Sequence, residues 1–307
     1  MRAWPEQLDA PGSAVTPAAP SPALRGIGFA VLAGACFVCM QAAAKAGAEA
    51  GYPAVQVVWA RFTLHLAALA LLMPHRLGAL FRTERPALQT LRGGFLVAST
   101  ACSFAALELL ALPEMTVITF VAPLFTMALA VLWLRERVGA RRWAAALVGF
   151  AAVAVAAGPD GLTANAGVVL ALGMALFYAL YQVATRALRH AAPAPTALFY
   201  AALAGAAVTS AVVPFFWRQP DLAGWGLLAL PALFGAVGQY VLIRAYETAP
   251  AGLVAPFMYI EFVWSVALGL AVFGFLPDGW TLAAAAIIIA SGLYIRHRER
   301  SAPCSSD

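Results

Sequence analysis

The sequence predicts an all-α polytopic membrane protein with ten transmembrane helices, arranged as two inverted five-helix repeats with both termini in the cytoplasm. Three observations support this fold class: an apolar composition, an alternation of charge between the apolar runs, and a motif that occurs twice. Hydrophobic residues make up 63% of the 307 residues and charged residues 11%, whereas soluble domains contain about a half and a quarter. The composition therefore excludes an ordinary soluble domain and favours a lipid bilayer.

The apolar runs define ten candidate spans of about 20 residues, the length that crosses the hydrocarbon core as a helix. All of them are expected to be helices, because an open strand cannot satisfy its backbone polar groups in lipid. Barrel strands would alternate in polarity, and these runs do not. The predicted spans are roughly 26–46, 54–73, 91–110, 115–134, 142–158, 167–187, 195–216, 225–245, 252–274 and 279–296.

The gaps between the spans alternate in charge. By the positive-inside rule, the arginine-rich gaps are cytoplasmic. This predicts cytoplasmic termini and an even number of spans. Because the arginines follow the membrane topology, the net charge of +5 is not a sign of nucleic-acid binding. The cytoplasmic set holds Arg2, Arg25, Arg76, Arg82, Arg85, Arg92, Arg135, Arg137, Arg141, Arg142, Arg186, Arg189, Arg244, Arg296, Arg298 and Arg300, and the other gaps hold Lys45 and Arg218 beside Glu49, Glu114, Asp160, Asp221 and Asp278.

One motif occurs twice, about 137 residues apart. The first copy runs from Ala111-Leu112-Pro113 through an apolar stretch to Arg135-Glu136-Arg137, and the second from Thr248-Ala249-Pro250 to Pro277-Asp278. About five spans separate equivalent points, so the second copy is expected to be inverted. Inverted repeats of this kind build secondary transporters, with the substrate site between the two halves.

The repeats and tails follow from these boundaries. Residues 25–158 are predicted to form the first five-helix repeat and residues 166–296 the second. Residues 1–24, rich in proline, alanine and serine, are predicted to be a disordered tail rather than a signal peptide. Residues 297–307 are predicted to be a cytoplasmic tail.

No cofactor, metal or ATP site is expected. Cys36 and Cys39 form a C-x-x-C pair inside an apolar span, with no histidine or second pair nearby. Small packing residues are the favoured interpretation, against a redox or zinc role. No phosphate-binding loop is present in the sequence, which argues against direct ATP drive.

The ordered set of motifs resembles the EamA-type branch of the drug/metabolite transporter superfamily. The likeness covers residues 26 to about 296 and rests on Arg61-Phe62, the turns at Pro113 and Pro250, Pro123, Arg135-Glu136-Arg137, Tyr259-x-Glu261-x-x-Trp264 and Pro277-Asp278-x-Trp280. It implies two EamA domains around a central cavity. It also implies that the protein moves small metabolites across a bacterial inner membrane. Two positions depart from the pattern, Phe275 in place of an acidic residue and Glu108 in an otherwise uncharged turn.

Arg61 and His65 are the first candidate substrate-binding residues. Arg61 lies about eight residues into the second span, or roughly 10 Å along a helix. An arginine at such a depth costs about 2.5–3.5 kcal/mol on insertion scales, so it must face the protein interior or water. It can anchor a polar or anionic substrate group, or it can tie the span to a neighbouring helix. His65, one turn further, can carry a proton or bind substrate, or it can be a buried histidine bonded to a backbone carbonyl.

Glu261 is the candidate proton-coupling residue. It lies inside the ninth span, two residues after Tyr259. A carboxylate isolated in an apolar environment can load and release a proton. The alternatives are a fixed ion pair or a cap for backbone groups near a bend.

The remaining candidate substrate-binding residues are polar side chains at similar depth: Gln182, Gln239, Tyr240 and Tyr259. They can line a cavity with a few well-placed hydrogen bonds, or they can join helices to one another. Gln41, Gln56 and Tyr181 share these properties.

Together these features predict a secondary transporter that moves a small polar metabolite, amino-acid-, nucleotide- or vitamin-like, by alternating access and with proton coupling as one option. An uncoupled facilitator or channel shares the architecture. A polytopic membrane enzyme would need a cluster of histidine, aspartate or serine at the membrane surface, and the sequence offers none. The expected partners are the lipid bilayer and the substrate, not nucleic acid, and the chain could also form a homo-oligomer.

Overall fold

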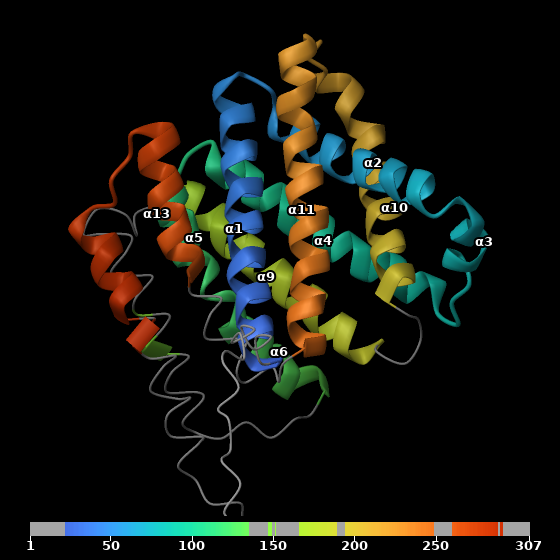
Figure 1. Cartoon of the computed structure of the whole chain (residues 1–307), viewed down its shortest axis with the longest axis horizontal. Helices are drawn as coiled ribbons and strands as arrows, with labels where there is room; N and C mark the ends of the chain where they lie inside the picture. The colour runs from blue at the N-terminus through green and yellow to red at the C-terminus, as the bar shows by residue number, and fades with distance from the viewer. Residues whose placement is uncertain are drawn as a thin grey trace, which may run out of the picture.

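The computed structural model describes residues 22–134, 147–148, 151, 166–188, 194–248, 260–287 and 289–290, and its regular elements within these ranges are all helical. The elements are α1 (Pro22–Glu49), α2 (Ala54–Leu72), η1 (Pro74–Arg76), α3 (Leu77–Leu80), α4 (Pro86–Leu107), α5 (Leu112–Thr119), α6 (Ala122–Leu134), α9 (Ala166–Ala187), α10 (Ala194–Val212), η2 (Val213–Phe216), α11 (Leu222–Thr248) and α13 (Ile260–Phe273) (Figure 1). Residues 279–287 are helical as well.

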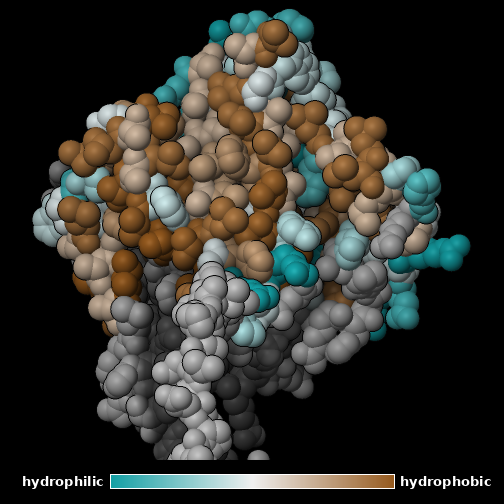
Figure 2. Space-filling view, in the orientation of Figure 1, coloured by the Kyte–Doolittle hydropathy of each residue, from teal (hydrophilic) through white to brown (hydrophobic). Residues whose placement is uncertain are grey.

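Seven helices in the described part of the chain are long and apolar enough to cross a membrane. They are Leu24–Glu49, Ala54–Leu72, Pro86–Leu107, Leu112–Trp133, Ala166–Thr185, Pro195–Phe216 and Leu222–Ala245. Figure 2 shows hydrophobic residues covering the face over α13, α1 and α11, with hydrophilic residues gathered at the top and at the right-hand edge beside α3. Leu71, Leu72 and Phe215 are at least 80% exposed, which suits contact with lipid. The predicted class, an all-α polytopic membrane protein, is confirmed.

The predicted spans differ from the helices in two places. The third span was predicted to begin at residue 91, but α4 begins at Pro86, a residue favoured in the first turn of a helix. Arg92, which the sequence counted among the charges of the cytoplasmic gap although the predicted span begins at residue 91, lies inside α4 and is only 2% exposed. The fourth span is divided into α5 and α6 at Phe120 and Val121. Pro123 has no backbone N–H to donate to the carbonyl of Thr119, which interrupts the helical hydrogen bonds at this point. Most of the predicted fifth span, and residues 252–259 of the ninth, lie outside the described residues.

Four connections meet at one end of the molecule, which we call the Tyr52 end. The turn between α1 and α2 contacts the segment between η2 and α11, where the Arg218 guanidinium carbon lies 5.7 Å from the centre of the Tyr52 ring. Lys45, near the end of α1, donates hydrogen bonds to the carbonyls of Leu107 and Leu110 at the end of α4. The Lys45 ammonium also lies 5.8 Å from the ring of Phe273, the last residue of α13.

The opposite end, which we call the Phe81 end, gathers the α3 region and the helix ends of the second half. The Phe81 ring lies 4.7 Å from the Phe199 ring, and the Tyr200 hydroxyl donates to the Phe81 carbonyl at 3.1 Å. Arg92, near the start of α4, donates to the carbonyl of Ala197 near the start of α10 and lies over the ring of Tyr181 near the end of α9.

The two sets of contacts fix the direction of each long helix. Helices α1, α4, α10 and α13 run toward the Tyr52 end, and α2, α5, α6, α9 and α11 run away from it. The first described helix of the second half, α9, therefore runs opposite to α1, and α10, α11 and α13 run opposite to α2, α4 and the α5–α6 pair.

The helix contacts come in matching pairs. Helices α1, α2, α4 and the α5–α6 pair of the first half correspond to α9, α10, α11 and α13 of the second. The contact of α1 with α11 therefore matches that of α9 with α4, and the contact of α2 with α11 matches that of α10 with α4. The contact of α1 with α13 matches those of α9 with α5 and α6. The contacts of α2 with α10 and of α5 with α13 lie between corresponding helices of the two halves. The described helices are thus arranged with approximate two-fold symmetry.

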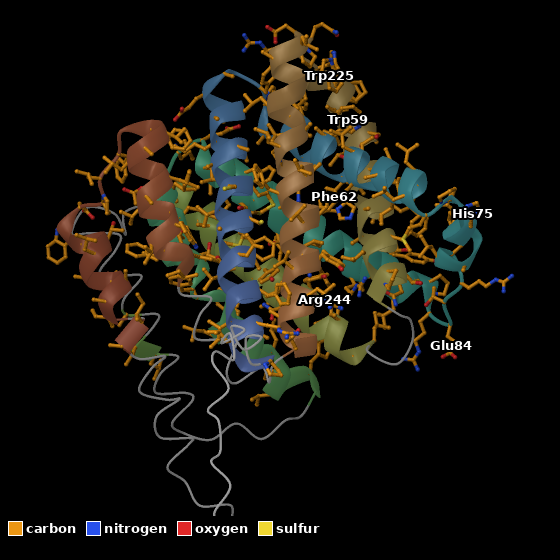
Figure 3. The ribbon with its side chains drawn as sticks, viewed as in Figure 1. Trp59, Phe62, His75, Glu84, Trp225 and Arg244 are labelled. Carbon is orange, nitrogen blue, oxygen red and sulfur yellow. The ribbon has the colours of Figure 1, made fainter. Side chains whose placement is uncertain are left out.

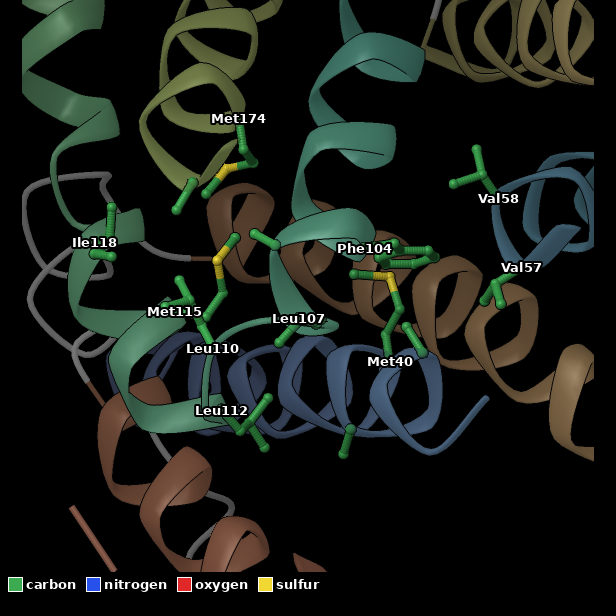
Figure 4. Close-up of a cluster of buried hydrophobic side chains, with 14 of the residues drawn as sticks. Met40, Val57, Val58, Phe104, Leu107, Leu110, Leu112, Met115, Ile118 and Met174 are labelled. Atoms are coloured by element: carbon green, nitrogen blue, oxygen red, sulfur yellow. The ribbon is translucent and has the colours of Figure 1, made fainter. Parts of the chain in front are cut away.

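The main hydrophobic core joins both halves. It includes Met40 of α1, Phe104 and Leu107 of α4, Met115 of α5 and Met174 of α9, which pack together in Figure 4. The contact between α2 and α10 is unusually close, because the Phe62 ring lies directly against the backbone at Gly205. A Cβ atom at Gly205 would lie 2.3 Å from Phe62 Cγ, so only glycine fits there in this packing.

Candidate substrate site

Arg61 projects from α2 into the centre of the helix bundle. Its Nη1 donates a hydrogen bond of 2.9 Å to the Thr100 hydroxyl of α4. The Thr100 hydroxyl in turn donates to the carbonyl of Leu96 one turn earlier. The guanidinium carbon lies 5.3 Å from the centre of the Phe62 ring and 5.7 Å from that of Phe104, within the range of cation–π attraction. Arg61 is therefore held by one hydroxyl and two aromatic rings.

Three further helices contribute to the same region. At Gly235 of α11, a Cβ atom would lie 3.6 Å from Arg61 Nε and 3.1 Å from the sulfur of Met40 of α1. Tyr178 and Tyr181 of α9 lie within electrostatic range of the Arg61 guanidinium. Their rings stack with centres 5.9 Å apart and an angle of 23°. The group around Arg61 thus draws residues from α1, α2, α4, α9 and α11, and so from both halves of the chain.

Among the described residues, no carboxylate forms an ion pair with Arg61. His65, one turn further along α2, is partly buried and near enough for Arg61 to act on it electrostatically. A polar imidazole beside a guanidinium that has no carboxylate partner among the described residues can help to bind an anionic group of a ligand. The structure therefore brings Arg61 and His65 together, as the sequence predicted.

Glu261 lies apart from this group. It is 9% exposed on α13, and its Cγ would lie 3.0 Å from a Cβ atom at Gly34 of α1. No hydrogen bond or ion pair reaches its carboxylate from the residues that the structure describes. Gly34 and Met40 are six residues apart on α1, about 9 Å along the helix axis. The structure thus describes Glu261 and Arg61 as two separate groups that contact the same helix.

The other predicted site residues occupy varied positions. Gln182 and Gln239 are partly buried on α9 and α11, and Tyr240 of α11 is 64% exposed. Tyr259 lies outside the described residues. Gln41 is buried, and its Oε1 has no hydrogen-bond partner in the part of the chain that the structure describes. Cys36 is buried and Cys39 partly buried, both as free thiols.

Gln56, one of the polar residues that the sequence marked as either cavity-lining or helix-joining, forms a bridge at the Tyr52 end. Its side-chain amide donates to the carbonyl of Arg218 at 2.7 Å and accepts from the N–H of Arg218 at 3.0 Å, which we call the Gln56 bridge. Gln56 is fully buried. The bridge joins α2 of the first half to the η2–α11 connection of the second half.

Aromatic residues surround the Gln56 bridge. Trp59 lies 5.3 Å from Trp217 and 6.4 Å from Trp225, measured between ring centres, and its Nε1 donates to Ser210 at 2.9 Å. Figure 3 shows Trp59 and Trp225 near the Tyr52 end, with Arg244 at the opposite end of α11. Tryptophan is enriched where a membrane meets water, and this is the one sequence signal that could have pointed to the cluster.

The charged residues near the ends of α1 and α4 line two adjoining clefts of about 280 and 340 Å³ at the Tyr52 end. Lys45, Glu49 and Glu108 line both. Two of these charges have structural roles: Lys45 caps the last carbonyls of α4, and Glu108 accepts the N–H of Ala54 at the start of α2. In the described ranges, no group of three or more histidine, cysteine, aspartate or glutamate residues could hold a metal ion.

Comparison with known proteins agrees with this architecture. The sequence profile of the EamA-like transporter family matches residues 24–158 and 165–296. An S-adenosylmethionine uptake transporter of Rickettsia bellii is 29% identical over 221 residues, which are 72% of this chain and 76% of the relative. A pseudopaline exporter of Pseudomonas aeruginosa is 28% identical over 271 residues, 87% of this chain and 94% of the relative. A riboflavin transporter of Vibrio cholerae is 32% identical over 180 residues, 58% of this chain and 60% of the relative.

A crystal structure of a protein 22% identical in sequence has the same fold, with a TM-score of 0.63 over 91% of this chain and 98% of that one. An apolar helical bundle and transporter relatives together define the class: a multi-pass membrane transporter for small molecules, not an enzyme. The chain belongs to the EamA-like transporter family of the drug/metabolite transporter superfamily.

Proposed function

We propose that this protein is a secondary carrier that moves a small polar metabolite across the bacterial inner membrane by alternating access. The group around Arg61 carries the proposal, because a cation without a carboxylate partner in the described part of the chain is held there by helices from both halves. A charge at membrane depth is costly unless it serves a site or pathway. In this proposal Arg61 and His65 bind a polar group of the substrate, and Gln182, Gln239, Tyr240 and Tyr259 contribute at other stages of transport.

The proposed topology has ten spans, in repeats of residues 25–158 and 166–296. The opposed directions of α1 and α9, and the matched helix contacts, support an inverted repeat. The arginines of the sequence support a cytoplasmic location for the Phe81 end and for both termini. The two ends could then open alternately, by rocking of the two halves about the Arg61 group.

The substrates of the relatives offer the first compounds to test. Purified protein reconstituted in vesicles is expected to exchange external radiolabelled substrate for an internal unlabelled pool, with S-adenosylmethionine, riboflavin, amino acids and nucleotides as candidates. Such counterflow is a property of carriers, because the binding site of a carrier changes sides with substrate bound in both directions. Simple equilibration, with no transient accumulation of label for any transported compound, would instead support a channel.

Replacement of Glu261 by glutamine tests proton coupling. We propose that the Glu261 carboxyl carries the coupled proton, since it is buried and free of ion pairs among the described residues. Glutamine has almost the same shape but cannot titrate, so Glu261→Gln is expected to fold normally. An imposed proton gradient is expected to accelerate transport severalfold in the wild type and not in the variant.

Glu49→Gln is a suitable control, because the Glu49 side chain is 56% exposed at the Tyr52 end. It is expected to keep the wild-type response to the gradient. If Glu261→Gln responded to the gradient as the wild type does, Glu261 would have no coupling role, and an uncoupled facilitator would become the better interpretation.

A further inference from the structure

Arg92 and Gln89 lie on one face of α4, near the Phe81 end, and both are almost fully buried. Gln89 is 1% exposed and Arg92 2% exposed. Residues three apart on a helix are neighbours on its surface. Each side chain has a polar atom without a hydrogen-bond partner among the described residues, Oε1 of Gln89 and Nε of Arg92. An unpaired buried donor or acceptor costs about 1–3 kcal/mol, so two of them side by side call for a functional explanation.

Arg92 also joins the two halves of the molecule. Its Nη2 donates to the carbonyl of Ala197 of α10, and its guanidinium carbon lies 5.6 Å from the centre of the Tyr181 ring of α9. We call these contacts the Arg92 bridge. Next to it, Gly93 lets α4 approach the α10 backbone, because a Cβ atom at Gly93 would lie 3.0 Å from the carbonyl oxygen of Tyr200.

Tyr181 links Arg92 to the group around Arg61. It lies within electrostatic range of both guanidinium groups and stacks on Tyr178. Arg61 is bonded to Thr100, eight residues after Arg92 on α4, which corresponds to about 12 Å along the helix. The guanidinium groups of Arg61 and Arg92 thus lie at two depths along α4, beside the stacked rings of Tyr178 and Tyr181. Among the described residues, neither cation is paired with a carboxylate.

We propose that Arg92 and Gln89 form a second substrate-binding site on the path from Arg61 to the Phe81 end, and that the substrate carries a carboxylate. The inference rests on the proposed carrier function and adds a substrate class to it. The carboxylate would pass from Arg61 to Arg92 when the Arg92 bridge separates. Arg92 Nε offers a free donor for the carboxylate, and Gln89 Oε1 offers a free acceptor for an amino or hydroxyl group of the same substrate.

The test compares two probe anions that differ in one amino group, succinate and L-aspartate. The thermal midpoint of the purified protein is measured against the concentration of each sodium salt, with sodium chloride at matched ionic strength as reference. Both dicarboxylates are expected to stabilise the wild type beyond chloride. Arg92→Gln is expected to weaken the apparent affinity for both about tenfold or more, and Arg92→Lys, which keeps the charge, by less.

Gln89→Leu separates binding from a purely structural role. It removes the unpaired acceptor without adding a charge, so it is expected to weaken the apparent affinity for L-aspartate and to leave that for succinate unchanged. A structural role of Gln89 would shift the midpoint without ligand and leave both affinities as they are. If Arg92→Gln fails to fold, Arg92→Lys and Gln89→Leu still decide the question.

The outcomes distinguish the second site from the carrier function. Wild-type affinities in both Arg92 variants and in Gln89→Leu would overturn the second site. If Arg61→Gln nevertheless lost affinity, the carrier site at Arg61 would stand alone. The absence of any stabilisation of the wild type by either dicarboxylate would overturn the carboxylate assignment, while counterflow of another compound would still support the carrier.

Discussion

Replacement of Arg61 by glutamine is expected to abolish most of the transport activity while the protein still folds. Glutamine keeps a polar group at this position but is too short to take the place of Nη1 at Thr100, and it offers no charge to the substrate. Loss of one charge-assisted contact costs about 2–3 kcal/mol, which corresponds to about 30- to 150-fold weaker binding. The expected result in counterflow is a rise in KM of this size, measured with the compound that the wild type transports best.

Two variants control for this result. Arg61→Lys keeps the charge but loses the planar fork of donors, so an intermediate loss is expected. Arg82→Gln removes an exposed arginine at the Phe81 end and is expected to keep the wild-type KM. A folded Arg61→Gln protein with wild-type affinity would exclude Arg61 from the substrate site.

Replacement of Gly205 by alanine is expected to lower the thermal midpoint markedly and to reduce transport as well. The new Cβ would lie 2.3–2.6 Å from three carbon atoms of the Phe62 ring. Overpacking of this kind costs about 1–3 kcal/mol, because the backbone or the ring must move. Phe62 adjoins Arg61 on α2, so a displacement of α2 from α10 would also move the proposed substrate site.

A second substitution can show that the effect comes from the Phe62 contact. Phe62→Leu leaves a smaller side chain at that position, so the double variant is expected to lose less stability than the sum of the two single changes. Gly28→Ala in α1 is the matched control, because nothing lies within 4 Å of its added Cβ atom, and a helical alanine is favoured over glycine. If Gly205→Ala lowered stability by the same amount with and without Phe62→Leu, the packing explanation would be contradicted.

The fold class could be predicted from the sequence because a chain in lipid must satisfy its backbone hydrogen bonds internally. Apolar runs of about 20 residues have to become helices, and the long helices from α1 to α11 follow the predicted spans closely. Arg92 shows the limit of this reasoning. Arg92 was counted among the charges of the gap before the third span, yet it is buried in α4, where α9 and α10 supply a ring and a carbonyl. Only the tertiary contacts make that position tolerable.

The candidate site was predictable in part. Arg61 stood out because a lone charge inside an apolar run is costly, and the structure surrounds it with residues of five helices. Thr100 and Tyr178 could not be chosen from the sequence, because threonine and tyrosine are common in membrane helices and their partners are distant in the chain. Gln56 was a candidate from the sequence, but its partner could not be predicted, because Arg218 is 162 residues away.

The two bridges between the halves differ in their electrical character. The Gln56 bridge is made by a neutral amide and the Arg92 bridge by a charged guanidinium, so separation of the Arg92 bridge would displace a positive charge. Moving a unit charge across the whole membrane changes its electrostatic free energy by about 2.3 kcal/mol per 100 mV. Arg92 would cross only a fraction of the membrane potential. With the Phe81 end in the cytoplasm, as proposed, a negative interior pulls Arg92 toward that side. Voltage would then favour the inward-open state over the outward-open state, even for a substrate without net charge.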